Sequence, residues 1–99
     1  MNEQDKITLM NHVIALARPV AADELKVDSL DIPLADTGLD SLDFLMVGIF
    51  LSDAYGMSED DLKAMEPHSL VVIRDMFDYL EKHATKHPAT AQEAISYIV

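Results

Sequence analysis

The segment from Ser41 to Tyr55 is apolar on nearly every side of the helix that its pattern predicts. Two glycines flank it, Gly38 before the helix and Gly56 after it, and each permits the backbone turn that a helix boundary needs. In a chain of 99 residues, a helix of this kind either lies at the centre of the core or presents a face to another molecule. This apolar helix therefore constrains the fold more than any other feature of the sequence does.

Two rows of side chains can be separated on this helix. The row expected to pack inward consists of Phe44, Val47, Leu51 and Ala54. The row on the serine side consists of Ser41, Leu45, Gly48 and Ser52, with Met46 and Ile49 beside it. Because so small a protein cannot bury every side of one helix, we expect the serine side to meet a partner.

Four further segments have apolar residues at helical spacing. The first helix is expected to begin at the cap Asn2 and to end at Arg18, before Pro19. A short third helix runs from Glu59 to Met65. The fourth helix spans 70–83 with Ser69 as its cap, and a short helical tail follows the capping pair Thr90 and Glu93.

The predicted class is all-α, a small four-helix bundle with a long first loop from about 20 to 40, a short third helix and an additional short C-terminal helical tail. We expect residues 1–84 to form the domain and residues 85–99 to be an extension. The apolar residues of the long loop, Leu25 among them, should lie against the core. The extension is either a frayed end or a docking element.

Acidic residues outnumber basic ones by 18 to 7, which gives a net charge of −11 and disfavours binding to nucleic acid. The charge either keeps the protein soluble or attracts a basic partner. Between residues 36 and 66, eight acids accompany a single base, Lys63, so the negative field is concentrated in the middle of the chain.

Cysteine is absent, so the chain has no disulfide framework and no thiolate chemistry of its own. No apolar run is long enough to cross a bilayer, and the first residues lack the pattern of a signal peptide. We therefore expect a cytoplasmic monomer. His83 and His87 are four residues apart, but no carboxylate pattern accompanies them and Pro88 follows at once, so we predict no metal site.

Ser41 is the residue whose setting carries chemistry. Gly38 permits a tight turn, and Ser41 then begins a helix, where its hydroxyl is accessible and the helix amides favour a nearby phosphate. Asp36, Asp40 and Asp43 surround it, and no histidine lies near in sequence to act as a base. This setting suits a serine that another enzyme modifies.

The run Gly38-Leu39-Asp40-Ser41-Leu42-Asp43 resembles the attachment motif of acyl carrier proteins. The resemblance extends over residues 2–83 and includes the long first loop, the short third helix and an Asp-Tyr-Leu late in the fourth helix. It implies that Ser41 carries 4′-phosphopantetheine, transferred from coenzyme A by a separate magnesium-dependent phosphopantetheinyl transferase. The protein would then be a non-catalytic carrier of acyl thioesters for a fatty-acid-like or polyketide-like, specialised pathway.

The resemblance also implies that the second helix is the recognition helix. The residues predicted to meet the transferase and the acyl-loading and acyl-using enzymes are Asp36, Asp40, Leu42, Asp43, Leu45, Met46, Ile49 and Asp53. Met46 and Ser52 replace glutamates that are typical of the family, and Gly48 replaces a branched residue. These departures predict partners with apolar as well as basic docking patches.

Gly48 has two readings. It packs tightly against another helix, or it makes room for an acyl chain or a partner. Two alternatives to acyl cargo also stay open. One is a carrier of aminoacyl or peptidyl groups, which Asp40 before the serine disfavours. The other is a helical adaptor that is never modified.

Overall fold

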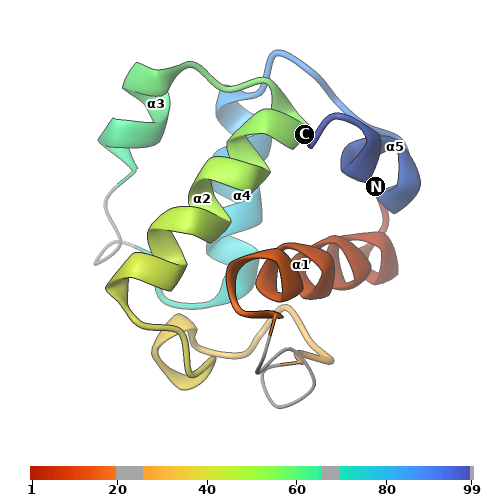
Figure 1. Cartoon of the computed structure of the whole chain (residues 1–99). Helices are drawn as coiled ribbons and strands as arrows, with labels where there is room; N and C mark the ends of the chain where they lie inside the picture. Colours follow the sequence, from red (N-terminus) through yellow and green to blue (C-terminus); the bar gives the residue numbers. More distant parts are fainter. Residues whose placement is uncertain (20–25, 66–69, 99) are drawn as a thin grey trace.

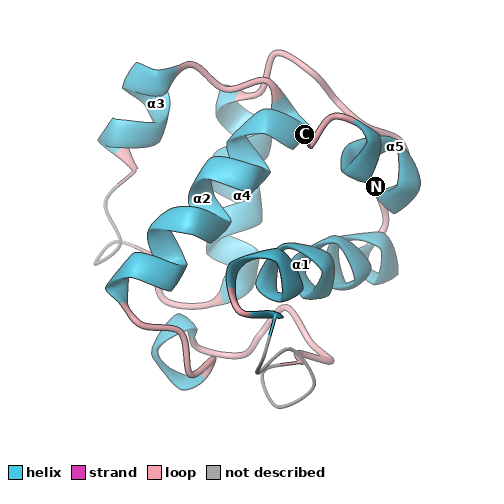
Figure 2. Cartoon of the chain, in the orientation of Figure 1, coloured by secondary structure: helices cyan, strands magenta, loops and turns pink. Residues whose placement is uncertain are grey.

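The computed structural model describes residues 1–19, 26–65 and 70–98, and these residues form an all-α fold (Figure 1). The helices are α1 (Glu3–Ala17), α2 (Ser41–Tyr55), α3 (Glu59–Ala64), α4 (Ile73–His83) and α5 (Ala91–Ser96), with a short 3₁₀ turn, η2 (Leu34–Asp36), in the long first loop. Figure 2 shows helices joined by loops, and the described residues contain no strand. The predicted all-α class is confirmed.

Side-chain caps explain where the helices begin. The Oδ1 atom of Asn2 accepts a hydrogen bond from the backbone N–H of Asp5 at 2.8 Å, which satisfies an amide that the first turn of α1 leaves free. At the other end of α2, Gly56 adopts a left-handed conformation with φ of 63° and closes the helix. Both boundaries lie where the sequence predicts them.

The core forms around α2, with α4 behind it and α1 crossing its side (Figure 1). The inner face of α2 contributes Val47, Leu51 and Ala54, all fully buried. The facing helices contribute large apolar side chains that are also fully buried: Leu9, Met10, Val13, Ile73, Met76, Phe77 and Leu80. Phe44, which was predicted to belong to the inner row, is only half-buried.

The described part of the long first loop, residues 26–40, packs onto this core, as predicted. Val27, Leu30 and Leu34 are buried, and the side chain of Asn11 pairs with both backbone groups of Val27 at 2.8 and 2.9 Å. Leu25 lies outside the described residues. The loop is therefore attached to α1 and follows the bundle up to the start of α2.

The fourth helix begins at Ile73, three residues later than predicted. Residues 71–74 instead pair with the first loop: the N–H of Leu34 donates to the carbonyl of Val71 at 2.9 Å, and the N–H of Ile73 donates to the carbonyl of Ile32 at 3.1 Å. Asp75 caps the helix by accepting from the N–H groups of Val71 and Val72, each at 3.0 Å. The predicted cap, Ser69, lies outside the described residues.

The C-terminal segment forms the predicted short helix, α5, which packs against α1 and α2. Ala91 and Ala94 are buried, and the Oγ1 atom of Thr90 caps the helix by accepting from the N–H of Glu93 at 3.1 Å. In the described part of the chain, no helix combines the length and apolar character needed to cross a membrane.

Candidate functional site

Ser41 is the first residue of α2, and its side chain is exposed. Asp40 and Asp43 form a reciprocal cap around it: the N–H of Asp43 donates to Asp40 Oδ1 at 2.9 Å, and the N–H of Asp40 donates to Asp43 Oδ2 at 3.3 Å. Before the cap, Gly38 has φ of 80°, and the buried hydroxyl of Thr37 donates to the carbonyl of Leu34 at 2.7 Å. The serine therefore stands on a backbone that is fixed from both sides.

Asp43 differs in placement from the other predicted recognition residues, because its side chain is buried. Its Oδ2 atom accepts a hydrogen bond from Arg18 Nη1 at 2.6 Å, and the same guanidinium nitrogen lies 4.0 Å from Asp40. The Asp43 carboxylate therefore joins the end of α1 to the start of α2, and it is not available to a partner. The exposed acids nearest to Ser41 in sequence are Asp36 and Asp40.

The charge state of this junction follows from its contacts. Burial acts to raise the pKa of the Asp43 carboxyl, but the hydrogen bond from Arg18, the backbone hydrogen bond within the cap and the positive charge of Arg18 together lower it below its ordinary value. The hydrogen bond to Asp43 likewise raises the pKa of Arg18. Asp43 is therefore ionised at neutral pH, and one positive charge lies within the acidic surround of the serine.

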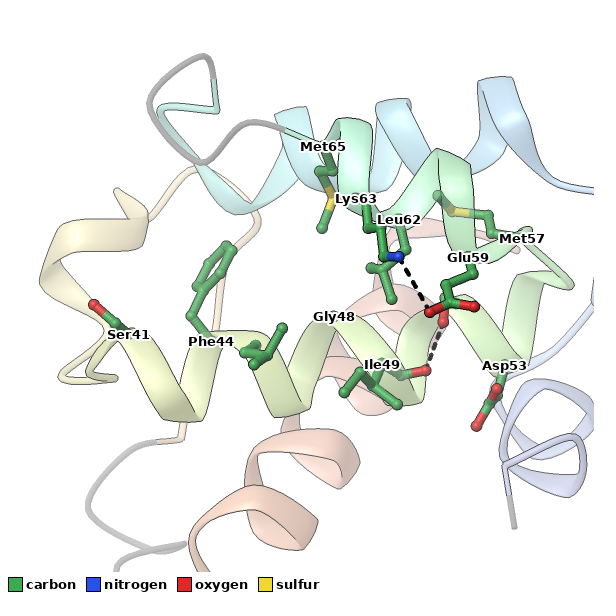
Figure 3. A pocket seen from close by; sticks show the side chains of 12 residues that line it. Ser41, Phe44, Gly48, Ile49, Asp53, Met57, Glu59, Leu62, Lys63 and Met65 are labelled. Carbon is green, nitrogen blue, oxygen red and sulfur yellow. Dashed lines mark hydrogen bonds and ion pairs between the residues drawn. The ribbon is translucent and has the colours of Figure 1, made fainter.

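A groove of about 700 Å³ opens at Ser41 and runs along α2 toward α3 (Figure 3). We call it the α2–α3 groove. Its lining is mainly apolar and includes Phe44, Leu45, Ile49, Met57, Leu62 and Met65. The serine lies at one end, and the charged side chains of Asp53, Glu59 and Lys63 lie toward the other, where Lys63 Nζ is 3.4 Å from Glu59 Oε1.

Gly48 lies in the wall of this groove and faces α3. A methyl group placed on it would meet Leu62 Cδ1 and Met65 Cε at 3.5 Å each, which is ordinary van der Waals contact. Close packing between α2 and α3 therefore does not require glycine at this position. The glycine leaves a gap between the two helices that a single methyl group would fill.

The position of α3 is held from α4. The hydroxyl of Tyr79 donates to the carbonyl of Asp61 at 2.9 Å, and His83 Nδ1 lies 3.7 Å from Asp61 Oδ1. The rings of Tyr79 and His83 lie 4.4 Å apart. His83 is thus engaged with α3, and His87 lines a separate recess with Lys6 and Glu81. The described residues contain no group of three or more potential metal ligands.

A second recess, of about 450 Å³, adjoins Ser41 on the side of the first loop. We call it the loop recess. Its apolar lining comprises Leu34, Leu39, Phe44, Leu70 and Val71, and Asp40 is the one charged residue among the described side chains that line it. Phe44 lines both cavities, so it stands between them.

The predicted recognition residues lie mostly on the surface of α2. Leu42 is 67% exposed and Leu45 is 54% exposed, while Met46 and Ile49 are partly exposed beside them. Leu45, Ile49 and Asp53 also line the α2–α3 groove. The groove residues contributed by α3 and its flanks were not predicted as site residues: Met57, Glu59, Leu62, Lys63 and Met65. The signal that could have indicated them is a pair of methionines, one before and one after a short helix.

No protein-family model matches the chain, and no curated protein or solved structure compared with it matches either.

Proposed function

We propose that the protein is an acyl carrier protein whose Ser41 bears 4′-phosphopantetheine. The observation that carries the proposal is the exposed Ser41 at the first position of α2, where it opens on the apolar α2–α3 groove. The helix order, the long first loop and the short α3 support a bundle of the acyl-carrier type in residues 1–84, which the C-terminal helix α5 completes. These features agree with the sequence, in which Asp40-Ser41-Leu42 resembles the attachment motif of acyl carrier proteins.

The setting of Ser41 suits modification by another enzyme. None of the hydrogen bonds between described residues joins Ser41 to a histidine, so these residues supply no evident base for a nucleophilic role of the serine. In the proposed loading step, Ser41 Oγ attacks the phosphorus of coenzyme A that bears the pantetheine. A new O–P bond forms, the bond to adenosine 3′,5′-bisphosphate breaks, and the hydroxyl proton passes to a base of the transferase.

Two features of the site fit the group. The start of α2 offers backbone amides to a phosphate, and the groove beside it offers apolar walls to what the arm carries. When attached, the arm supplies a thiol that holds the acyl group as a thioester. The chain's own residues anchor the arm at Ser41 and shield the cargo from water between Phe44, Leu62 and Met65.

The lining of the groove favours acyl over aminoacyl or peptidyl cargo. Near the serine the walls are the side chains of Phe44 and Leu45. The charged side chains among the described lining residues, Asp53, Glu59 and Lys63, lie toward the other end. An aliphatic chain gains about 0.8 kcal/mol for each buried methylene group, whereas a charged or amide-rich group needs polar partners that these walls do not offer.

The outer face of α2 is the proposed docking surface for partner enzymes. Its exposed apolar residues are Leu42, Leu45, Met46 and Ile49, with the acids Asp36, Asp40 and Asp53 around them. A partner with basic groups around an apolar patch complements this surface. We place the protein in the cytoplasm as a monomer, where a reducing environment keeps the thiol of the arm free.

Intact-mass measurement after incubation with coenzyme A, magnesium and a broad-specificity phosphopantetheinyl transferase tests the proposal. We expect a gain of one phosphopantetheine, lost in Ser41→Ala and retained in Ser58→Ala. Ser58 is the matched control, because it is also an exposed serine at the start of a helix. Absence of any gain with several transferases would contradict the proposal and leave the unmodified adaptor as the function.

The docking surface has its own test. Met46→Glu should weaken binding to a partner enzyme, because it places a charge on the apolar face without entering the core. Binding measured by titration calorimetry should stay unchanged for Gln92→Glu, on the exposed side of α5. Equal affinity of the Met46→Glu protein and the original protein would contradict an apolar docking face.

A further inference from the structure

The loop recess has no role in the function proposed above, yet it shares Ser41 with the α2–α3 groove. Its rim includes Val71, whose side chain is 66% exposed and is among the most exposed large apolar side chains of the molecule. The floor is formed by the buried Leu34 and Leu70. An exposed valine over an apolar recess is an unfilled contact surface.

The walls of the recess are held by backbone hydrogen bonds. The carbonyl of Val71 accepts from the N–H of Leu34 at 2.9 Å, and the N–H of Val71 donates to Asp75 Oδ2 at 3.0 Å. Val71 is therefore fixed through both of its backbone groups, and the first loop is fixed to it. The recess is preformed, so a ligand that enters it need not order the walls.

We infer that the loop recess seats the branched segment of the prosthetic arm that directly follows its phosphate. This inference rests on the proposed function. In phosphopantetheine, a carbon bearing two methyl groups lies one methylene beyond the phosphate ester, so a compact apolar group is tethered close to Ser41 Oγ. The recess begins at that same serine and offers Leu39, Phe44 and Val71 to it.

Shape and charge distinguish the two cavities for this segment. The α2–α3 groove is long and leads away from Ser41, which suits an extended chain, whereas the loop recess is smaller and lies directly at the serine. Asp40 lines the recess, and its negative charge disfavours entry of the phosphate. The dimethyl group can enter while the phosphate stays outside.

If the recess binds the proximal arm, Phe44 separates the binding site of the arm from that of the cargo. The proximal arm is held on one side of its ring, and the cargo lies on the other side, in the α2–α3 groove. A seated proximal segment limits the directions in which the rest of the arm can leave Ser41. Val71 and Leu39 are thus positioning residues for the arm and make no contact with the reacting thioester.

Methyl-labelled holo-protein provides the test. The protein is labelled with ¹³C in the methyl groups of leucine and valine, loaded from unlabelled coenzyme A, and checked by intact mass. Isotope-filtered NOE spectra should show contacts from the two methyl groups of the arm to Val71 and Leu39. Contacts to Leu62 in the α2–α3 groove instead, or to neither set of residues, would overturn the inference.

Two matched variants sharpen the result. Val71→Ser removes an exposed apolar side chain from the recess, and the NOE between the arm and Leu39 should be lost. Leu16→Ser removes an exposed apolar side chain from α1, outside both cavities, and the NOE should be kept. Retention of the Leu39 contact in Val71→Ser would overturn the seating role of Val71.

The mass measurement separates this inference from the function on which it rests. A protein that gains no phosphopantetheine contradicts the proposed function itself. A protein that gains the arm but shows no contact to Val71 and Leu39 remains a carrier, and only the seating of the arm is overturned.

Discussion

At the scale of single residues, the junction of Arg18 and Asp43 is the most consequential contact. It joins two helices through a hydrogen bond of 2.6 Å to a buried carboxylate beside Ser41. Removing one partner of such a pair leaves the other without its counter-charge. The junction should therefore affect stability in a pH-dependent way.

Asp43→Asn should lower the melting temperature at neutral pH. The pKa of Asp43 is lowered in the folded protein, so its stabilising effect is present above the pKa of about 3.9 for an unfolded aspartate and is lost as pH falls through the lower folded value. Melts from neutral to strongly acidic pH should show the two proteins converging at low pH. Asp78→Asn, at an exposed position of α4, is the control and should show no such convergence.

Tyr55 presents the opposite case, a buried polar group with no hydrogen-bonding partner among the described residues. Its hydroxyl is buried and makes no hydrogen bond within the described part of the chain, and burial, followed by the charge of Glu81, raises its pKa. Tyr55→Phe removes an unsatisfied group, so the free energy of unfolding should rise by about 1 kcal/mol in urea titrations.

Tyr79→Phe is the matched comparison for Tyr55→Phe. It loses the 2.9 Å hydrogen bond to the carbonyl of Asp61 and should be destabilised by about 1 kcal/mol. If Tyr55→Phe also proved destabilising, its hydroxyl would have a hydrogen-bonding partner, such as an ordered water molecule.

At the scale of elements, α2 and α3 form the site between them, and Gly48 sets the space. Gly48→Ala fits at van der Waals distance from Leu62 and Met65 and improves helix propensity, so stability should rise by about 1 kcal/mol in chemical denaturation. A destabilised Gly48→Ala protein would show that α2 and α3 pack too closely for a methyl group.

Gly48→Leu tests the role of the α2–α3 groove in protecting the cargo. A methyl group at this position already reaches contact with Leu62 and Met65, so the larger leucine side chain would displace these two side chains in the groove wall. If Ser41 carries the proposed acyl arm, we expect its thioester on the Gly48→Leu protein to be cleaved faster by neutral hydroxylamine than on the Gly48→Ala protein, because the cargo would be more exposed. Equal cleavage rates for the two variants would place the cargo outside the α2–α3 groove.

Local patterns predicted some elements better than others. The bounds of α2 follow from Asp40, Gly56 and a continuous apolar segment, all of which act within the helix itself. The predicted start of α4 was wrong, because residues 71–74 form backbone hydrogen bonds with the loop at 30–34, some forty residues earlier in the chain. Helical spacing could not reveal a competing partner at that distance.

The candidate site shows the same limit. Ser41 and the exposed face of α2 were predictable, since one motif and one helix contain them. The burial of Asp43 was not, because it depends on Arg18 at the end of another helix. Leu62 and Met65 could be placed in the groove only once α3 was placed against Gly48.

At the scale of the whole molecule, the bundle is completed by its C-terminal segment. Backbone N–H groups of Thr85 and Lys86 donate to the carbonyl of Tyr55 at 3.0 Å, and Ala94 joins the core formed with α1. Residues 85–99 were predicted as an extension that is either frayed or docked, and the contacts of α5 correspond to docking on the protein's own core.

Ala94→Asp should therefore destabilise the entire fold. It buries a charge in the core, at a cost of about 3 kcal/mol or more in the free energy of unfolding. Gln92→Asp changes an exposed position of the same helix and should have little effect. Similar denaturation midpoints for the two variants would mean that α5 contributes little to the core.

The contact between Arg18 and Asp43 has one more consequence, which concerns the order of folding and modification. The two residues are 25 positions apart, so the surroundings of Ser41 are complete only after α1 has docked on α2. An enzyme that recognises this junction therefore distinguishes a mature molecule from a nascent or misfolded one. If Ser41 is loaded as proposed, the modification would be confined to chains that have finished folding.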